Sequence, residues 1–351
     1  MKAFIESAVS ISPQHTFGTG EFLSEPVEPE NRWFFCSHPN YREFINPAAL
    51  RRMSPVIRMG LCSAMRCLEE AGGNQPDAII IGSGLGCIKD TVKFLKQMKE
   101  NNEQLLNPTA FIQSTHNTVS GQIALQMGCR GYNLTFSQKS ISFESALIDA
   151  LMVLVQDQVP GILVGGLDEI TEDSFELLVN AGCARPWIKG TTGSGKGFIA
   201  GEGAAFFMLG ADVTERSLAV LDEVRVICQP GGAAGMRKEI DRFLSDHQLG
   251  PEGVDILMTG RNGDTREDAI YTALEEGFSQ SVILGYKHLT GEYDTASAFG
   301  MFLASKVLHH QVIPGATRLN DIEKSQINRI LLVNQCRGRD LSLILLSAIQ
   351  S

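Results

Sequence analysis

The sequence lacks the features of several narrow classes of protein. Its eight cysteines are scattered singly and include no C-x-x-C pair. Such spacing is typical of reduced, packed thiols and indicates neither a disulfide framework nor a zinc site. No run of 18 or more apolar residues could cross a bilayer, so we expect no membrane association. The first residues alternate like a strand and do not form a charged and then apolar leader, so we expect a cytoplasmic protein.

Positive charge is also in short supply. The 30 Lys and Arg residues are outnumbered by 40 Asp and Glu residues, which gives a formal net charge of −10. Binding to a phosphate backbone needs a basic face, so this balance disfavours nucleic acid as a partner. The 351 residues are 43% hydrophobic and 20% charged. This composition is typical of a soluble globular protein with one large core or two fused, similar halves.

Two glycine clusters match nucleotide-binding loops only in part. In the segment 82–86 the spacing is G-x-G-x-G, which puts the third glycine in the wrong place for a dinucleotide fingerprint. In the segment 190–196 the spacing G-x-x-x-x-G-K is present, but no strand precedes it and no helix follows it. The sequence therefore predicts no nucleotide cofactor, and its cysteine spacing predicts no metal.

Residues 117–169 show the clearest organisation. Their periodicity predicts a helix over Thr118–Met127, a strand over Asn133–Ser137, a helix over Ile141–Gln156 and a buried strand over Gly161–Val164. The first strand feeds into the second helix through Gln138, Lys139 and Ser140. A side chain at such a junction lies at the sheet edge, beside the free N–H groups of the helix. This elbow is where a fold would place a nucleophile.

Strand and helix patterns alternate along the rest of the chain as well. The further predicted elements are a strand in residues 1–12, a helix over Ser54–Ala71, a strand and helix in 77–98, an acidic helix after Gly166, a strand over Ser217–Val226, a helix over Gly235–Asp246, a strand over Asp255–Thr259, helices over Arg266–Phe278 and Thr295–His309, and a hairpin of Arg329–Val333 with Leu341–Ala348. The alternation therefore occurs twice, as two β-α halves would produce.

Five consecutive patterns in the central stretch point to a family. They are N-x-x-x-G, G-x-R-G, the elbow, A-L-I-x-x-A and G-G-x-[DE], and they run without a gap from Asn117 to Asp168. Together they resemble the β-ketoacyl-acyl carrier protein synthases of the thiolase fold. The resemblance implies an α/β, thiolase-like fold with two similar β-α halves in a five-layered αβαβα arrangement. We expect residues 1–209 and 210–351 to form these halves of a single compact unit.

The resemblance also assigns the positions at which the family carries out its chemistry. There, an elbow cysteine accepts the acyl group and two histidines polarise the malonyl thioester. Aligning the motifs puts Ser140 at the cysteine, Gly260 at the first histidine and Glu292 at the second, while Lys287 is retained. The family also has a glycine-rich loop near the C-terminus, called the gate, and of its residues only Gly338 is clearly retained here. These departures indicate that the scaffold persists while the condensing chemistry has been lost, so activity as an enzyme is uncertain.

The segment before the central stretch approaches the partner subunit in this family. We therefore take Phe111, Ile112, His116 and Asn117 as candidates for a substrate tunnel or an interface. For Phe111 and Ile112, however, plain core packing is the preferred interpretation.

Four functions remain open. The favoured one is a non-condensing subunit similar to a chain length factor, which pairs with an active ketosynthase in type II fatty acid, polyketide or aryl-polyene biosynthesis and shapes the acyl tunnel. Its acidity suggests that docking of the acidic acyl carrier protein falls to the partner. The alternative is an active acyltransferase, esterase or atypical 3-oxoacyl synthase that uses Ser140 with Glu292, His116 or His288. A decarboxylase variant and a structural homodimer are the remaining hypotheses.

Overall fold

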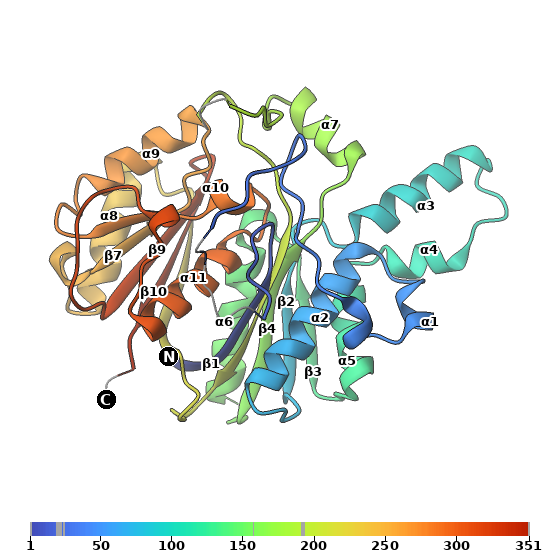
Figure 1. The fold of residues 1–351 in the computed structure, drawn as a ribbon, viewed down its shortest axis with the longest axis horizontal. Helices are drawn as coiled ribbons and strands as arrows, with labels where there is room; N and C mark the ends of the chain where they lie inside the picture. The colour runs from blue at the N-terminus through green and yellow to red at the C-terminus, as the bar shows by residue number, and fades with distance from the viewer. Residues whose placement is uncertain (1, 19–22, 24, 157, 191–193, 350–351) are drawn as a thin grey trace.

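The computed structural model describes residues 2–18, 23, 25–156, 158–190 and 194–349, and its strands form one large twisted sheet (Figure 1). The strands are β1 (Ala3–Ile11), β2 (Ala78–Gly82), β3 (Tyr132–Phe136), β4 (Gly161–Asp168), β5 (Gly203–Gly210), β6 (Ala219–Cys228), β7 (Ile256–Thr259), β8 (Val282–Gly285), β9 (Arg329–Cys336) and β10 (Asp340–Ser347). Across the sheet their order is β3-β2-β4-β5-β1-β6-β10-β9-β7-β8.

The strand order confirms two similar halves. The first five strands run 3-2-4-5-1 from the edge inward, and the last five, counted from β6, follow the same order in reverse. The halves meet where β1 pairs antiparallel with β6 over three residue pairs, Ala3 with Leu221, Phe4 with Val220 and Ile5 with Ala219. A boundary at residues 209/210 would fall at the end of β5, and its position stays a prediction.

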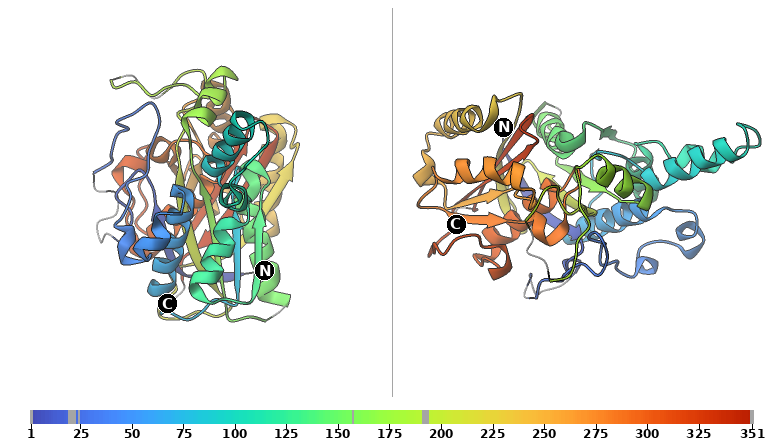
Figure 2. Two further views of the ribbon diagram at one scale, coloured as in Figure 1. Left: turned by 90° about the vertical axis from the view of Figure 1, so that its right-hand side faces the viewer. Right: turned by 90° about the horizontal axis from the view of Figure 1, so that it is seen from above.

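The two five-stranded halves of the sheet and the main helices form five layers (Figures 1 and 2). Helices α2 (Pro55–Glu70) and α5 (Thr118–Met127) cover the outer face of the first half, and α8 (Gly232–Asp246) and α9 (Thr265–Glu275) cover that of the second. Between the halves lie α6 (Ser142–Gln156) and α11 (Ser297–His310), which contact strands of both. Helix α11 is buried along most of its length, as expected of a helix that is apolar all round. The αβαβα arrangement is therefore confirmed.

The shorter helices lie around this frame. They are α1 (Pro47–Leu50), α3 (Ile88–Glu100), α4 (Pro108–Gln113), α7 (Glu172–Asn180) and α10 (Lys287–Thr290). In Figure 1, α3 and α4 project from the body of the molecule. None of the helices in the described ranges is long and apolar enough to cross a membrane.

Most predicted elements are confirmed to within a few residues, but the sequence analysis missed five of the elements described above, namely α1, α4, α10, β5 and β8. It anticipated neither β5 nor β8, which are short apolar runs, and periodicity does not assign such runs to a strand or a helix. It also missed α4, and with it the environment of two residues. Phe111 is 56% exposed and Ile112 is 64% exposed, so the interpretation that they pack in the core of this chain is wrong.

Candidate functional site

The elbow forms at the predicted place. A short 3-10 turn over Lys139–Ile141 joins β3 to α6, and Lys139 has a φ of 56°. Few residues other than glycine adopt this left-handed conformation. The hydroxyl of Ser142 holds the turn, since it accepts from the backbone N–H of Gln138 at 2.8 Å and donates to the carbonyl of Lys139 at 2.6 Å. Ser140 is thereby placed at the wall of a cavity.

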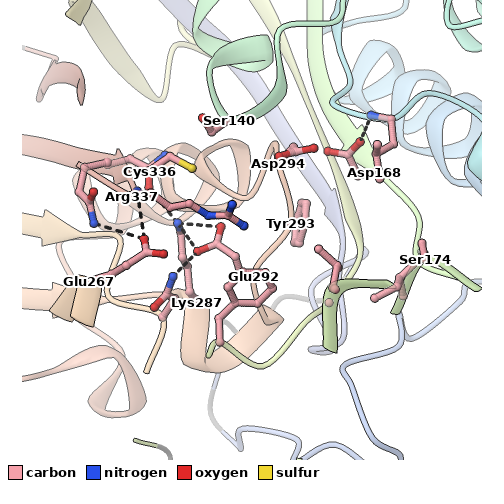
Figure 3. Close-up of a pocket in the computed structure, with 18 of the residues that line it drawn as sticks. Ser140, Asp168, Ser174, Glu267, Lys287, Glu292, Tyr293, Asp294, Cys336 and Arg337 are labelled. Atoms are coloured by element: carbon pink, nitrogen blue, oxygen red, sulfur yellow. Dashed lines mark hydrogen bonds and ion pairs between the residues drawn. The ribbon is translucent and has the colours of Figure 1, made fainter. Parts of the chain in front are cut away.

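This cavity has a volume of about 120 Å³ and draws its walls from both halves of the chain (Figure 3). Its polar or charged lining comprises Ser140, Asp168, Glu169, Ser174, Asn262, Glu267, Lys287, Glu292, Tyr293, Asp294, Asn334, Gln335, Cys336 and Arg337. Its apolar wall includes Leu85, Ile170, Leu178 and Phe198. Of the residues that the sequence analysis assigned to a functional site, Ser140, Lys287 and Glu292 line this cavity.

Gly260, at the position of the first histidine, has no room for a side chain. It follows β7, and its N–H donates to the carbonyl of Val333 at 3.0 Å. A Cβ added there would lie 2.5 Å from Asn334 Oδ1 and 2.6 Å from Tyr271 Oη. Real Cβ atoms do not approach so closely, because the atoms would overlap. The space that an imidazole would need is therefore filled by other side chains.

Glu292, at the position of the second histidine, is held in a buried ion pair. Lys287 Nζ lies 2.9 and 2.7 Å from the two carboxylate oxygens of Glu292 and 2.9 Å from Asn334 Oδ1. The amide of Asn262 donates to the same carboxylate at 2.8 Å. Burial acts to lower the pKa of Lys287, but the charge of Glu292 outweighs it and raises that pKa above its usual value. Lys287 is thus a fixed cation, and Glu292 is occupied by it.

Cys336 is a cavity residue that the sequence analysis missed. It ends β9, and it lines the same cavity as Ser140. Burial raises the pKa of the thiol, and the nearby Glu292 carboxylate raises it further. A protonated thiol is a poor nucleophile, so Cys336 does not restore the missing cysteine. Cys336 lies next to Arg337 and Gly338 in the segment that aligns with the glycine-rich gate, and this position in the sequence could have identified it as a cavity residue.

The remaining candidates lie away from the cavity. Phe111, Ile112, His116 and Asn117 are all exposed on the segment that includes α4 and the start of α5. The ring of His288 contacts the carbonyl of Ala316 through Nε2 at 2.7 Å. No histidine among the described residues lines the cavity, so neither His116 nor His288 is placed to act as a base for Ser140.

Two aspartates lie close together at the far side of the cavity (Figure 3). Asp168 ends β4 and accepts five hydrogen bonds of 2.9 to 3.2 Å, from Ser83, Gly84 and Leu85 and from the N–H and hydroxyl of Thr295. Asp294 makes no hydrogen bond or ion pair with any described residue. Burial, followed by the charge of Asp168, raises the pKa of Asp294 from 3.8 to about 6.

The raised pKa of Asp294 predicts a measurable pH dependence. Between pH 3.8 and about 6 the folded state binds this proton more tightly than the unfolded state does. The folded state is therefore favoured at the acidic end of this range, and that advantage is lost as the pH rises through about 6. Replacing Asp294 by Asn removes the effect. We expect the stability of Asp294→Asn relative to the parent to increase from pH 4 to pH 7, as measured by urea denaturation.

The exposed Asp212→Asn variant is the control for this measurement. It should follow the parent over the same pH range, because Asp212 lies on the surface. If Asp294→Asn and the parent keep a constant difference in stability at every pH, the raised pKa of Asp294 is contradicted.

A metal would need several ligands close together. No group of three or more His, Cys, Asp or Glu side chains suited to a metal ion occurs in the part of the chain that the structure describes. The glycine loop at 190–196 lies partly outside the described residues. Its described end does not precede a helix, and Gly195 N–H donates to the carbonyl of Gly263 at 2.9 Å.

Comparison with known proteins agrees with this architecture. Residues 28–188 match the model of the β-ketoacyl synthase N-terminal domain. A 3-oxoacyl-[acyl-carrier-protein] synthase 2 from Vibrio harveyi is 20% identical over 319 residues, which cover 80% of this chain and 76% of that protein.

Solved structures extend the likeness to the whole fold. The ishigamide ketosynthase/chain length factor superimposes with a TM-score of 0.80 at 16% identity and covers 99% of both chains. One chain from the structure of a type II polyketide synthase acyl-carrier protein in complex with its ketosynthase superimposes with a TM-score of 0.73 at 14% identity, again over 99% of both chains. The chain thus resembles the β-ketoacyl-acyl carrier protein synthases in sequence over residues 28–188 and has their fold over nearly its entire length.

Proposed function

We propose that this chain is a non-condensing β-ketoacyl synthase-like subunit of the chain-length-factor type. It pairs with an active ketosynthase in type II fatty acid, polyketide or aryl-polyene biosynthesis and helps to shape the acyl tunnel. The observation that carries the proposal is the state of the cavity. Among the described residues no histidine lines the cavity of Ser140. The space beside Gly260 is filled by Tyr271 and Asn334, and Glu292 is neutralised by Lys287.

The chemistry of condensation does not suit these groups. A serine hydroxyl is far harder to ionise than a thiol, and without a base it does not attack a thioester. Decarboxylation of a malonyl group needs donors that stabilise the developing enolate. Asp294 and Glu267 place carboxyl groups in the cavity, and an ionised carboxylate accepts hydrogen bonds but cannot donate one to the enolate.

A partner surface supports the pairing. Exposed apolar side chains occur on α3, α4, α5 and β3, namely Leu95, Phe111, Ile112, Leu125 and Leu134. Strand β3 lies at one end of the sheet and pairs only with β2 within the described residues. An unpaired edge beside apolar side chains is a surface that proteins usually cover. We take this surface as the interface with a ketosynthase, or with a second copy if the chain forms a homodimer.

The structural relatives are consistent with such pairing. One is a ketosynthase/chain length factor, and another is an acyl-carrier protein in complex with its ketosynthase. In the proposed assembly the acidic acyl carrier protein contacts this subunit only indirectly. The net charge of −10 makes the chain a poor dock for an acidic protein, so the active partner provides the docking site.

Charge placed on this surface should disrupt the pair. We expect Phe111→Asp to weaken the heterodimer by about 2 kcal/mol, or roughly thirtyfold in Kd, because a carboxylate would be buried against an apolar partner. The measurement is analytical ultracentrifugation of this chain mixed with a candidate intact ketosynthase with which it forms a stable complex on co-expression. Val213→Asp is the matched control, since Val213 is 54% exposed but lies away from α4. Equal Kd values for the two variants would reject α4 as an interface.

A labelling experiment separates the silent subunit from an active acyltransferase. The presence of the Ser140 hydroxyl and the Cys336 thiol in the lining of one cavity is the observation that keeps the second function open. Purified protein is incubated with acyl-carrier-protein and coenzyme A thioesters and examined by intact mass. We expect no acyl adduct in the parent. Stoichiometric acylation that Ser140→Ala abolishes and Cys336→Ala leaves intact would favour an enzyme that uses Ser140.

A further inference from the structure

Two side chains of opposite charge face the cavity without a partner. Asp294 follows α10 and makes no hydrogen bond or ion pair with any described residue. Arg337 lies in the turn between β9 and β10, and its guanidinium likewise makes none with the described residues. Figure 3 shows Arg337 reaching into the space that Ser140, Glu292 and Asp294 surround. Charged groups that line a cavity and lack partners are candidates for ligand recognition.

The other charged groups of the cavity are already engaged. Lys287 and Glu292 neutralise each other, and Asp168 accepts five hydrogen bonds. Glu267 accepts from Gln335 and from the backbone of Arg337 through long contacts of 3.4 and 3.5 Å, and its burial raises its pKa. Glu169, the remaining charged group of the lining, accepts from the backbone N–H groups of Val56 and Lys89 at 3.3 and 2.9 Å. The carboxylate of Asp294 and the guanidinium of Arg337 therefore remain available, and they do not form an ion pair with each other.

Part of the cavity wall is apolar. Leu85, Ile170, Leu178 and Phe198 line the same cavity. A ligand that matches all three features carries a cation, an anion and a small apolar group. The cavity is about 120 Å³, so the ligand must be small.

We infer that the cavity binds a free α-amino acid or a zwitterion of the same kind. Its carboxylate pairs with the guanidinium of Arg337, which offers two parallel donors. Its ammonium group donates to Asp294, and its side chain lies on Phe198 and Leu178. The inference goes beyond the role of a silent subunit and does not depend on it, because no acyl transfer or partner is involved.

Three probes that differ in charge test the inference. L-leucine, L-leucinamide and N-acetyl-L-leucine share one side chain, but the amide lacks the anion and the acetylated compound lacks the cation. Binding to the whole chain is measured by calorimetry and thermal shift at concentrations of about 10 mM, at which even a millimolar site is largely filled. We expect leucine to bind and each of the other two to bind at least about tenfold more weakly. Equal binding of all three, or no binding of leucine, alanine or phenylalanine, overturns the inference.

Matched variants test whether leucine binds in this cavity. Asp294→Asn and Arg337→Gln should each weaken leucine binding at least about tenfold, because each removes one charge-assisted contact. Arg339→Gln, in the same turn and exposed like Arg337, and the exposed Asp321→Asn should leave it unchanged, because neither Arg339 nor Asp321 lines the cavity. If Asp294→Asn and Arg337→Gln bind leucine as the parent does, the site is not in this cavity and the inference is wrong.

Discussion

Lys287→Met should lower the free energy of unfolding by about 3 to 5 kcal/mol, because it leaves the Glu292 carboxylate buried without its cation. The side chain of Lys287 is only 2% exposed and that of Glu292 is 16% exposed, so water compensates little of the loss. Urea denaturation at neutral pH measures the change. Arg66→Met is the control, since the contact of Arg66 with Glu70 is on the surface and its removal should cost less than about 1 kcal/mol.

The double variant distinguishes an ion pair from simple packing. If the cost of Lys287→Met comes from a stranded charge, replacing Glu292 by Leu as well should recover most of it, because an apolar pair of similar volume is often as stable as a buried ion pair. A double variant that loses the sum of the two single effects would show that Lys287 and Glu292 contribute independently. In that case the proposed neutralisation of Glu292 is contradicted.

Gly260→His should also destabilise the protein, by about 3 kcal/mol, and should not restore condensation. The first atom of the new side chain would overlap Asn334 Oδ1 and Tyr271 Oη, and forcing groups into a filled core costs about 1 to 3 kcal/mol or more. Thermal and urea denaturation measure the loss, and an assay with malonyl and acyl thioesters measures the activity.

Two further variants test whether steric overlap explains the expected loss of stability in Gly260→His. Gly260→Ala in a Tyr271→Phe background should be less costly than in the parent, because the clashing hydroxyl is gone. Gly121→Ala provides the control, since a Cβ there meets no atom within 4 Å and alanine favours the interior of α5 by roughly 0.5 to 1 kcal/mol. Should Gly260→His be as stable as the parent, the position is open and the pocket is not blocked as described.

Local patterns in the sequence were sufficient for the elements that surround the elbow. Helical periodicity and flanking glycines predicted α5, the elbow and α6 to within one residue, and the order of the motifs predicted the thiolase-like fold. The order of the strands in the sheet was not predicted, because periodicity does not show which strands pair.

Contacts between distant residues explain what the sequence did not show. That Tyr271 and Asn334 fill the space beside Gly260 depends on how α9 and β9 pack, and no local pattern encodes it. Phe111 and Ile112 were assigned to the core because they are apolar, although an interface has the same composition as a core. Cys336 was counted as a packed thiol, since only the folded chain brings it to Ser140.

The five hydrogen bonds to Asp168 affect how the protein unfolds. This one carboxylate ends a strand of the first half, holds the loop after β2 and also holds Thr295 at the start of α11, a helix of the second half. Neither half can open at this point without stranding a buried charge. We therefore expect the chain to melt in a single cooperative step, with α6 and α11 among the last amides to exchange with deuterium.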